Sequence, residues 1–273
     1  IECSLELVDN TLWEKNGHEL CFGQYVYKVE SLLEEKTTKK VFVENSDVNL
    51  GVKGDNFHII FSKSYGSMVS VKYNEKQFIK YPPFPNFWRA PTDNDRGNKM
   101  ANRYSQWKIA SLYNRVVNID ISEREDGASI TYTYELATSP VTYCKVTYDV
   151  NSLGQIKVKM LYDGFEGISE MPAFGMTMKL PADYENVKWY GNGLEETYLD
   201  RKHGAKLGVF ENKVKDNISD YVVPQECANK TEVRWFTVTD NKGLGIKVSA
   251  SIPFEFSALP YTAHELESAG HHF

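Results

Sequence analysis

The chain has 273 residues, of which 41% are hydrophobic and 25% charged, and its formal net charge at pH 7 is −6. This balance is typical of a globular protein with room for one large domain or two smaller ones. The acidic balance argues against nucleic acid as a partner, and the absence of an apolar run of about 18 residues argues against a membrane span. Because the chain starts at Ile1 with residues typical of the middle of a strand, we interpret it as part of a longer polypeptide. The sequence leaves a cytoplasmic or a periplasmic location open.

The first residues predict two strands, around Glu2–Val8 and Cys21–Glu30, with a loop between them. A polar stretch, Glu34–Lys40, follows and is typical of a linker. We therefore assign residues 1–30 to the end of a preceding β-sandwich domain and residues 31–43 to a linker. Residues 44–273 form one large β domain in this interpretation.

Alternating apolar and polar residues dominate the remainder of the chain. The predicted apolar strand faces are Ile130, Tyr132, Tyr134 and Leu136; Cys144, Val146, Tyr148 and Val150; and Ile156, Val158, Met160 and Tyr162. Further predicted hairpins pair residues 57–61 with 68–73, and residues 234–239 with 245–252. Strands with one apolar face indicate antiparallel sheets with one side in water, so the predicted fold class is all-β and antiparallel.

Helical periodicity is nearly absent. The best candidate is Lys99–Ala110, in which Met100, Tyr104, Trp107 and Ile109 would line one side.

The densest motif is Pro85–Gly97, with the sequence PNFWRAPTDNDRG. Its Asn, Asp and Gly residues favour a structured loop. The spacing does not fit an EF-hand. Asp93 and Asp95 could flank a sugar as glycosidase carboxylates do, or they could bond backbone amides and fix the loop. We expect Arg89 to be largely buried and paired with Asp93 or Asp95, or with a nearby carbonyl. We expect Trp88 to contact sugar or to pack in the core.

A second motif, Trp189–Arg201, combines aromatic and polar residues. Such residues suit sugar rings and hydroxyl groups, and the alternative is that they are structural. The candidates are Trp189, Glu195, Tyr198, Arg201 and the neighbouring His203. The two glycines do not form a phosphate loop, since no Lys-Ser/Thr pair follows.

A third motif runs from Tyr221 through Gln225 and Glu226 to Trp235. Arg234 is predicted to pair with Glu226 through two hydrogen bonds. Six histidines are scattered without zinc-site spacing, so we predict no metal site. Four cysteines without CxxC spacing are interpreted as buried free thiols, with a Cys3–Cys21 bridge as the alternative.

Together, Phe87–Asp95, Trp189–Arg201 and Tyr221–Trp235 resemble, in order and spacing, the small-chain region (domain 5) of glycoside hydrolase family 2 β-galactosidases. The resemblance covers residues 44–273. It implies a β-supersandwich of the galactose-mutarotase type, truncated at its C-terminus. It also implies that residues 1–30 end an immunoglobulin-like domain. The family's parent enzymes hydrolyse terminal β-galactosides with retention, using two glutamates on a TIM barrel, and nothing in this sequence predicts such a barrel.

The resemblance also implies a place for this chain in a larger enzyme. Its segment around "DND" would border the galactose pocket, which here means Asp93, Asn94, Asp95, Gly97 and Asn98. No catalytic residue and no cofactor would lie in this chain, and any Mg or Na ions of the parent would bind outside it. Its partners would be the barrel and immunoglobulin-like domains of the parent, the galactoside, and further copies in a homo-oligomer.

The leading hypothesis is therefore a non-catalytic part of a β-galactosidase, inactive alone. One alternative is a carbohydrate-binding module. A less favoured one is an aldose 1-epimerase, whose acid–base pair would come from His203 or His264 with Glu195 or Glu226.

Overall fold

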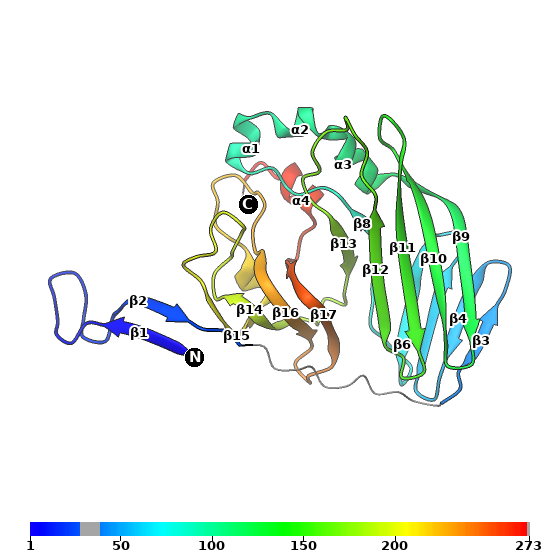
Figure 1. Ribbon diagram of the computed structural model, residues 1–273, viewed down its shortest axis with the longest axis horizontal. Helices are drawn as coiled ribbons and strands as arrows, with labels where there is room; N and C mark the ends of the chain where they lie inside the picture. Colours follow the sequence, from blue (N-terminus) through cyan, green and yellow to red (C-terminus); the bar gives the residue numbers. More distant parts are fainter. Residues whose placement is uncertain (28–38, 272–273) are drawn as a thin grey trace.

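Antiparallel sheets form most of the fold in the computed structural model, which describes residues 1–27 and 39–271 (Figure 1). Every strand pairing among these residues is antiparallel. The prediction of an all-β fold with antiparallel sheets is confirmed.

Two sheets pack face to face around the main core. The five-stranded sheet contains β3 (Phe42–Asn45), β4 (Asn49–Lys53), β5 (Phe57–Ser62), β6 (Ser67–Tyr73) and β7 (Lys76–Gln77). The four-stranded sheet contains β9 (Asn114–Arg124), β10 (Gly127–Leu136), β11 (Thr142–Asn151) and β12 (Ile156–Tyr162). Residues of both sheets share one buried cluster, and the Tyr132 hydroxyl donates across it to the Ser62 carbonyl at 3.0 Å.

A third sheet has its own small core. It contains, in spatial order, β15 (Lys206–Lys213), β14 (Asn186–Gly193), β16 (Lys230–Thr239) and β17 (Gly245–Phe256). Trp189 is fully buried there between Phe210 and Phe256. The remaining elements are β8 (Tyr81–Asn86) paired with β13 (Gly175–Lys179), the 3-10 helix η1 (Val214–Asn217) and α4 (Ala263–Ser268).

The predicted alternation is confirmed where strands lie inside a sheet. Ile130, Tyr132, Tyr134 and Leu136 are each at most 1% exposed, and so are Cys144, Val146, Tyr148 and Val150. The prediction fails at Val158, which is 47% exposed. The reason is that β12 is the edge strand of its sheet, so its apolar face has fewer neighbours to cover it.

The predicted helix at 99–110 is present but divided into two, and a further short helix that was not predicted precedes it. Three short helices, α1 (Asp93–Gly97), α2 (Met100–Arg103) and α3 (Ser105–Leu112), lie along one end of the sheets (Figure 1). Met100 and Trp107 are buried, as expected. Ile109, predicted on the same side, is 47% exposed, because two residues along a helix turn the side chain by about 200° away from Trp107.

The N-terminal hairpin pairs β1 (Glu2–Glu6) with β2 (Glu19–Gln24). It contacts β15, because the Gln24 side chain bonds the Leu207 backbone at 2.7 and 2.9 Å. Cys3 lies opposite Gly23 and Cys21 opposite Leu5, and both thiols are free and exposed. The expectation of buried thiols is therefore wrong for these two and right for Cys144 and Cys227.

The predicted linker, residues 31–43, lies mostly outside the described residues, as does the end of the predicted strand Cys21–Glu30. Phe42 and Val43 already belong to β3. The domain boundaries at 30 and 44 stay a prediction.

Candidate functional site

The three sequence motifs, far apart along the chain, meet in one polar network. From the first motif, Arg96 Nη2 donates to the Pro224 carbonyl at 2.8 Å, and the Asp93 N–H donates to Gln225 Oε1 at 3.1 Å. The Glu226 N–H donates to the Ala90 carbonyl at 3.2 Å. The first motif is thus attached to the third on both sides of the start of α1.

A capping box begins α1. The Asp95 N–H donates to Thr92 Oγ1 at 3.2 Å, and the Thr92 N–H donates to Asp95 Oδ2 at 2.9 Å. Such a box satisfies backbone donors that a helix start otherwise leaves without partners. The segment predicted as a loop is therefore a short helix at this point. Asp95 accepts a hydrogen bond from a backbone amide, which was one of the two alternatives proposed for it. Asp93 instead accepts hydrogen bonds from the side chains of Arg96 and Gln225.

Arg89 holds Asp95 through a two-point ion pair. Both Arg89 Nη atoms donate to the Asp95 carboxylate, the Nη2–Oδ1 distance being 2.9 Å. Burial raises the pKa of Asp95, but hydrogen bonds from Arg89 and Thr92 outweigh it and hold that pKa below its ordinary value. The predicted pairing with Asp95 is confirmed. The expectation of a largely buried arginine is wrong in degree, since the Arg89 side chain is 32% exposed.

We expect Arg89→Ala to lower the free energy of unfolding by about 2 kcal/mol. Removing one partner of a buried pair costs about 3–5 kcal/mol, and water at the exposed third of Arg89 reduces this. Urea denaturation at pH 7 measures the change. Arg115→Ala is the matched control, because Arg115 pairs with Glu135 while its own side chain is 72% exposed. If both variants lose the same free energy of unfolding, the ion pair of Arg89 with Asp95 stabilises the chain no more than an exposed pair does.

Glu196 joins the second motif to the third. Its side chain is 12% exposed and accepts four hydrogen bonds. The donors are the Tyr221 hydroxyl (2.5 Å), Arg201 Nη2 (2.5 Å), the Ser219 hydroxyl (3.0 Å) and the Ala228 N–H (2.9 Å). Burial raises the pKa of Glu196, but these bonds outweigh it and hold that pKa below its ordinary value.

Glu226 is a partly buried residue whose carboxyl group lies close to Arg89 of the first motif and Glu196 of the second. Burial raises its pKa to about 7, against the smaller opposing effects of the Arg89 charge and a hydrogen bond with the Ala90 backbone. Asp95 and Glu196 lie close enough to raise it further. The predicted partner Arg234 is wrong: Arg234 pairs with Glu232 at 3.6 Å and lies over the Tyr190 ring. Glu232 stands two residues before Arg234 within β16, at a positive φ of 55° where the pairing of β16 with β17 shifts register.

Comparison with known proteins places these motifs in a family. The profile described as "Beta galactosidase small chain" matches residues 53–273, which include all three motifs. A β-galactosidase small subunit from Latilactobacillus sakei is 33% identical over 268 residues, covering 86% of this chain and 83% of that protein. The chain belongs to the β-galactosidase small chain family.

Longer relatives contain the same region. A β-galactosidase from Halalkalibacterium halodurans is 42% identical over 276 residues, covering 99% of this chain and 27% of that protein. One from Streptococcus thermophilus is 38% identical over 274 residues, covering 100% of this chain and 26% of that protein. The chain therefore spans about a quarter of the length of these relatives.

The tryptophans of the first two motifs, Trp88 and Trp189, are structural. Trp88 and Trp189 are both 0% exposed. Trp88 Nε1 donates to Glu267 at 2.8 Å, and Trp189 Nε1 donates to the Asn192 carbonyl at 3.0 Å. With no ring face exposed, each stabilises the packing beneath its motif.

The structure separates the other predicted residues. Glu195 and His203 are exposed. The Tyr198 ring lies 4.8 Å from the Arg201 guanidinium, and its buried hydroxyl has no hydrogen-bond partner among the described residues. The charged groups that act on His264 are Lys108, Glu267 and Glu265, so the structure does not bring His264 together with Glu195 or Glu226. The predicted pocket loop is mainly exposed: Asp93, Asn94, Gly97 and Asn98 face solvent, and only Asp95 is buried.

A cavity of about 300 Å³ lies beside Glu196, lined by Glu195, Asn212, Lys230 and others. Lys230 is 3% exposed, donates to the Leu194 carbonyl at 3.0 Å and lies 5.1 Å from the Trp189 ring. Burial lowers its pKa. The described residues contain no group of three or more His, Cys, Asp and Glu side chains that could hold a metal ion, and no helix long and apolar enough to cross a membrane.

Sequence reasoning named Gln225 within the third motif without giving it a role, and it missed Glu196 and Lys230. The spacing of Glu196 could have revealed it. Glu196 stands two residues before the predicted site residue Tyr198, and alternate residues of an extended segment point to the same side. Its neighbour Glu195 was chosen instead. Gln225 and Lys230 gave no such signal, because their partners lie in other motifs.

Proposed function

We propose that this chain is a non-catalytic part of a β-galactosidase that borders the sugar pocket of a catalytic domain outside it. The observation that carries this proposal is the anchored helix α1. The residues Asp93, Asn94, Gly97 and Asn98 on and just after this helix are exposed. Arg89 of the same motif holds the buried Asp95 of the helix, and Gln225 of the third motif accepts a hydrogen bond from the Asp93 N–H. A polar edge held rigidly in this way suits the wall of a sugar pocket.

The finer parts of the proposal follow the family resemblance. The parent enzyme is a family 2 glycoside hydrolase that acts with retention, and its two glutamates stand on a TIM barrel. Mg and Na ions of the parent bind outside this chain, and the parent is a homo-oligomer. A separate small subunit in Latilactobacillus sakei supports the idea that this region functions next to a second polypeptide segment.

Reconstitution from two polypeptides tests the proposal. The chain and the remaining part of its parent are produced separately, and hydrolysis of a chromogenic β-galactoside is measured for each and for the mixture. We expect activity only in the mixture, because the described residues of the chain supply the pocket edge alone. Hydrolysis by the chain alone, or an inactive mixture that nevertheless co-elutes as a complex, would overturn it.

A variant sharpens this test. In the active mixture, Asn98→Ala is expected to raise KM about fivefold, the cost of about 1 kcal/mol for one lost hydrogen bond. The control is Asn118→Ala, an exposed asparagine on β9. An unchanged KM for Asn98→Ala would show that this end of α1 does not reach the sugar.

A further inference from the structure

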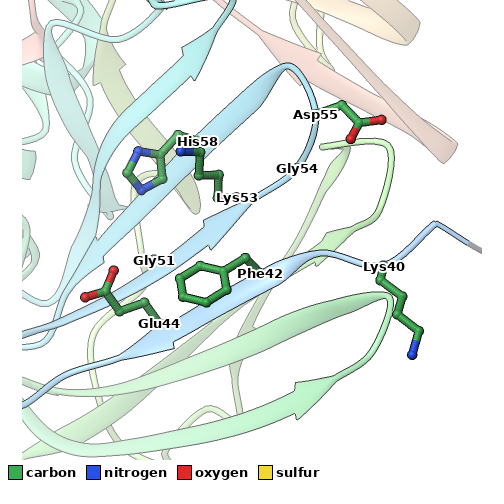
Figure 2. Close-up of a pocket in the computed structure, with 8 residues that line it drawn as sticks. All are labelled: Lys40, Phe42, Glu44, Gly51, Lys53, Gly54, Asp55 and His58. Carbon is green, nitrogen blue, oxygen red and sulfur yellow. The ribbon is translucent and has the colours of Figure 1, made fainter.

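A groove of about 520 Å³ lies on the outer face of the five-stranded sheet, where β3, β4 and β5 run side by side. Figure 2 shows the Phe42 ring and the side chains of Glu44, Lys53 and His58 around Gly51. In Figure 1, β3 and β4 lie at the far right, whereas α1 and β14–β15 lie to the left. The groove is therefore separate from the network of the three motifs.

Strand register explains how these residues come together. Phe42 lies opposite Lys53, and Lys53 opposite His58, so the three form one row across the sheet. Glu44 lies opposite Gly51 in the next row. These residues point outward, because their neighbours Leu50, Val52 and Ile59 are 0% exposed and fill the core behind them.

Gly51 makes the hollow. A Cβ atom at this position would lie 3.5 Å from His58 Nε2 and 3.9 Å from the Glu44 Cβ, in ordinary contact with both. The strand does not require glycine there, since its φ is not positive. A larger side chain would therefore fit the backbone and occupy the groove.

The polar groups of the groove divide into two kinds. At its ends, Lys40 pairs with Glu125 at 3.1 Å and Asp55 pairs with Lys39 at 2.9 Å. At its centre, the side chains of Glu44, Lys53 and His58 make no hydrogen bond or ion pair with other residues that the structure describes. Donors and acceptors of both charge signs are thus free beside an aromatic ring that is 65% exposed.

We propose that this groove is a second saccharide-binding site, for a neutral pyranoside. The C–H face of a sugar ring packs on Phe42, while its hydroxyl groups donate to Glu44 and accept from Lys53 and His58. Because the free groups carry both signs, they suit a neutral polyhydroxyl ligand better than an anion or a cation. The groove's volume is within the range of about 300–1,000 Å³ typical of small-ligand sites. The proposal does not rest on the pocket border at α1.

Amide chemical-shift mapping of the isotopically labelled chain, titrated with methyl β-D-galactopyranoside and with lactose, tests the proposal. We expect saturable shifts at β3, β4 and β5. Phe42→Ala is expected to raise the Kd about tenfold, through loss of the aromatic contact. Gly51→Val should abolish binding, because its methyl groups fill the hollow.

Tyr143→Ala is the matched control, since Tyr143 is 51% exposed on β11 of the other sheet. Its Kd should equal that of the unaltered chain, and thermal melts should show that all three variants are folded. Absence of saturable shifts would overturn the proposal, as would binding that Phe42→Ala and Gly51→Val leave unchanged. Shifts confined to α1 and α2 would also overturn it while leaving the proposed pocket border intact.

Discussion

Glu196→Ala is expected to lower the free energy of unfolding by about 3–5 kcal/mol, the cost of breaking a buried, hydrogen-bonded charge network. Four donors from three places in the chain converge on this carboxylate, and the substitution leaves all of them without it. The Ala228 N–H and the Tyr221 hydroxyl lose an acceptor that alanine cannot replace. The melting temperature should fall by roughly 10 °C.

The adjacent residue supplies the control for this experiment. Glu195 has the same side chain and charge but is exposed, so Glu195→Ala should change the free energy of unfolding by less than about 0.5 kcal/mol. Chemical denaturation of both variants measures the difference. If the two losses are equal, Glu196 is not the residue that joins the second and third motifs.

Glu226→Gln is expected to change how stability depends on pH. The pKa of Glu226 is about 7 in the folded chain and is ordinarily 4.5, so the folded state binds a proton more tightly than the unfolded state does. Stability from this group is fully present below about pH 4.5 and is lost as the pH rises to about 7. The loss amounts to about 3 kcal/mol, at about 1.4 kcal/mol for each pKa unit.

The glutamine variant has no proton to lose, so its stability should not fall over that range. Urea denaturation at about pH 5, 6, 7 and 8 compares it with the unaltered chain. Asp95 and Glu196 have lowered pKa values, so their contributions to stability are lost only below about pH 5. This holds for the variant and for the unaltered chain alike. The difference between the two stability curves therefore isolates Glu226. Parallel curves from pH 5 to 8 would contradict a raised pKa for this carboxyl group.

These two predictions concern neighbouring carboxyl groups whose pKa values move in opposite directions. Glu196 accepts four hydrogen bonds, which stabilise its charged form. At Glu226, the Arg89 charge and one backbone hydrogen bond offset the effect of burial only in part, and the charges of Asp95 and Glu196 act against ionisation. A network of this kind exchanges a proton near neutral pH where the three motifs meet, next to the helix that we propose borders the sugar pocket.

The sequence by itself determined the strand pattern. Alternation of apolar and polar residues depends only on local backbone geometry, in which successive side chains point to opposite faces, so Ile130–Leu136 could be assigned without knowing its neighbours. The capping box of α1 is also local, because Thr92 and Asp95 are three residues apart, but this segment was predicted as a loop. The family motifs were also visible, since their residue types and spacing are properties of the chain alone.

Only the tertiary structure decided which residues of the motifs act together. Glu195 and Glu196 are indistinguishable in composition, and burial against Tyr221 and Ala228 separates them. Arg234 was predicted to pair with Glu226 but forms its ion pair with Glu232. The groove at Gly51 depends on the register of three strands. These outcomes depend on contacts between segments distant in sequence, which local propensity does not encode, because burial and electrostatic partners are set by packing of the whole chain.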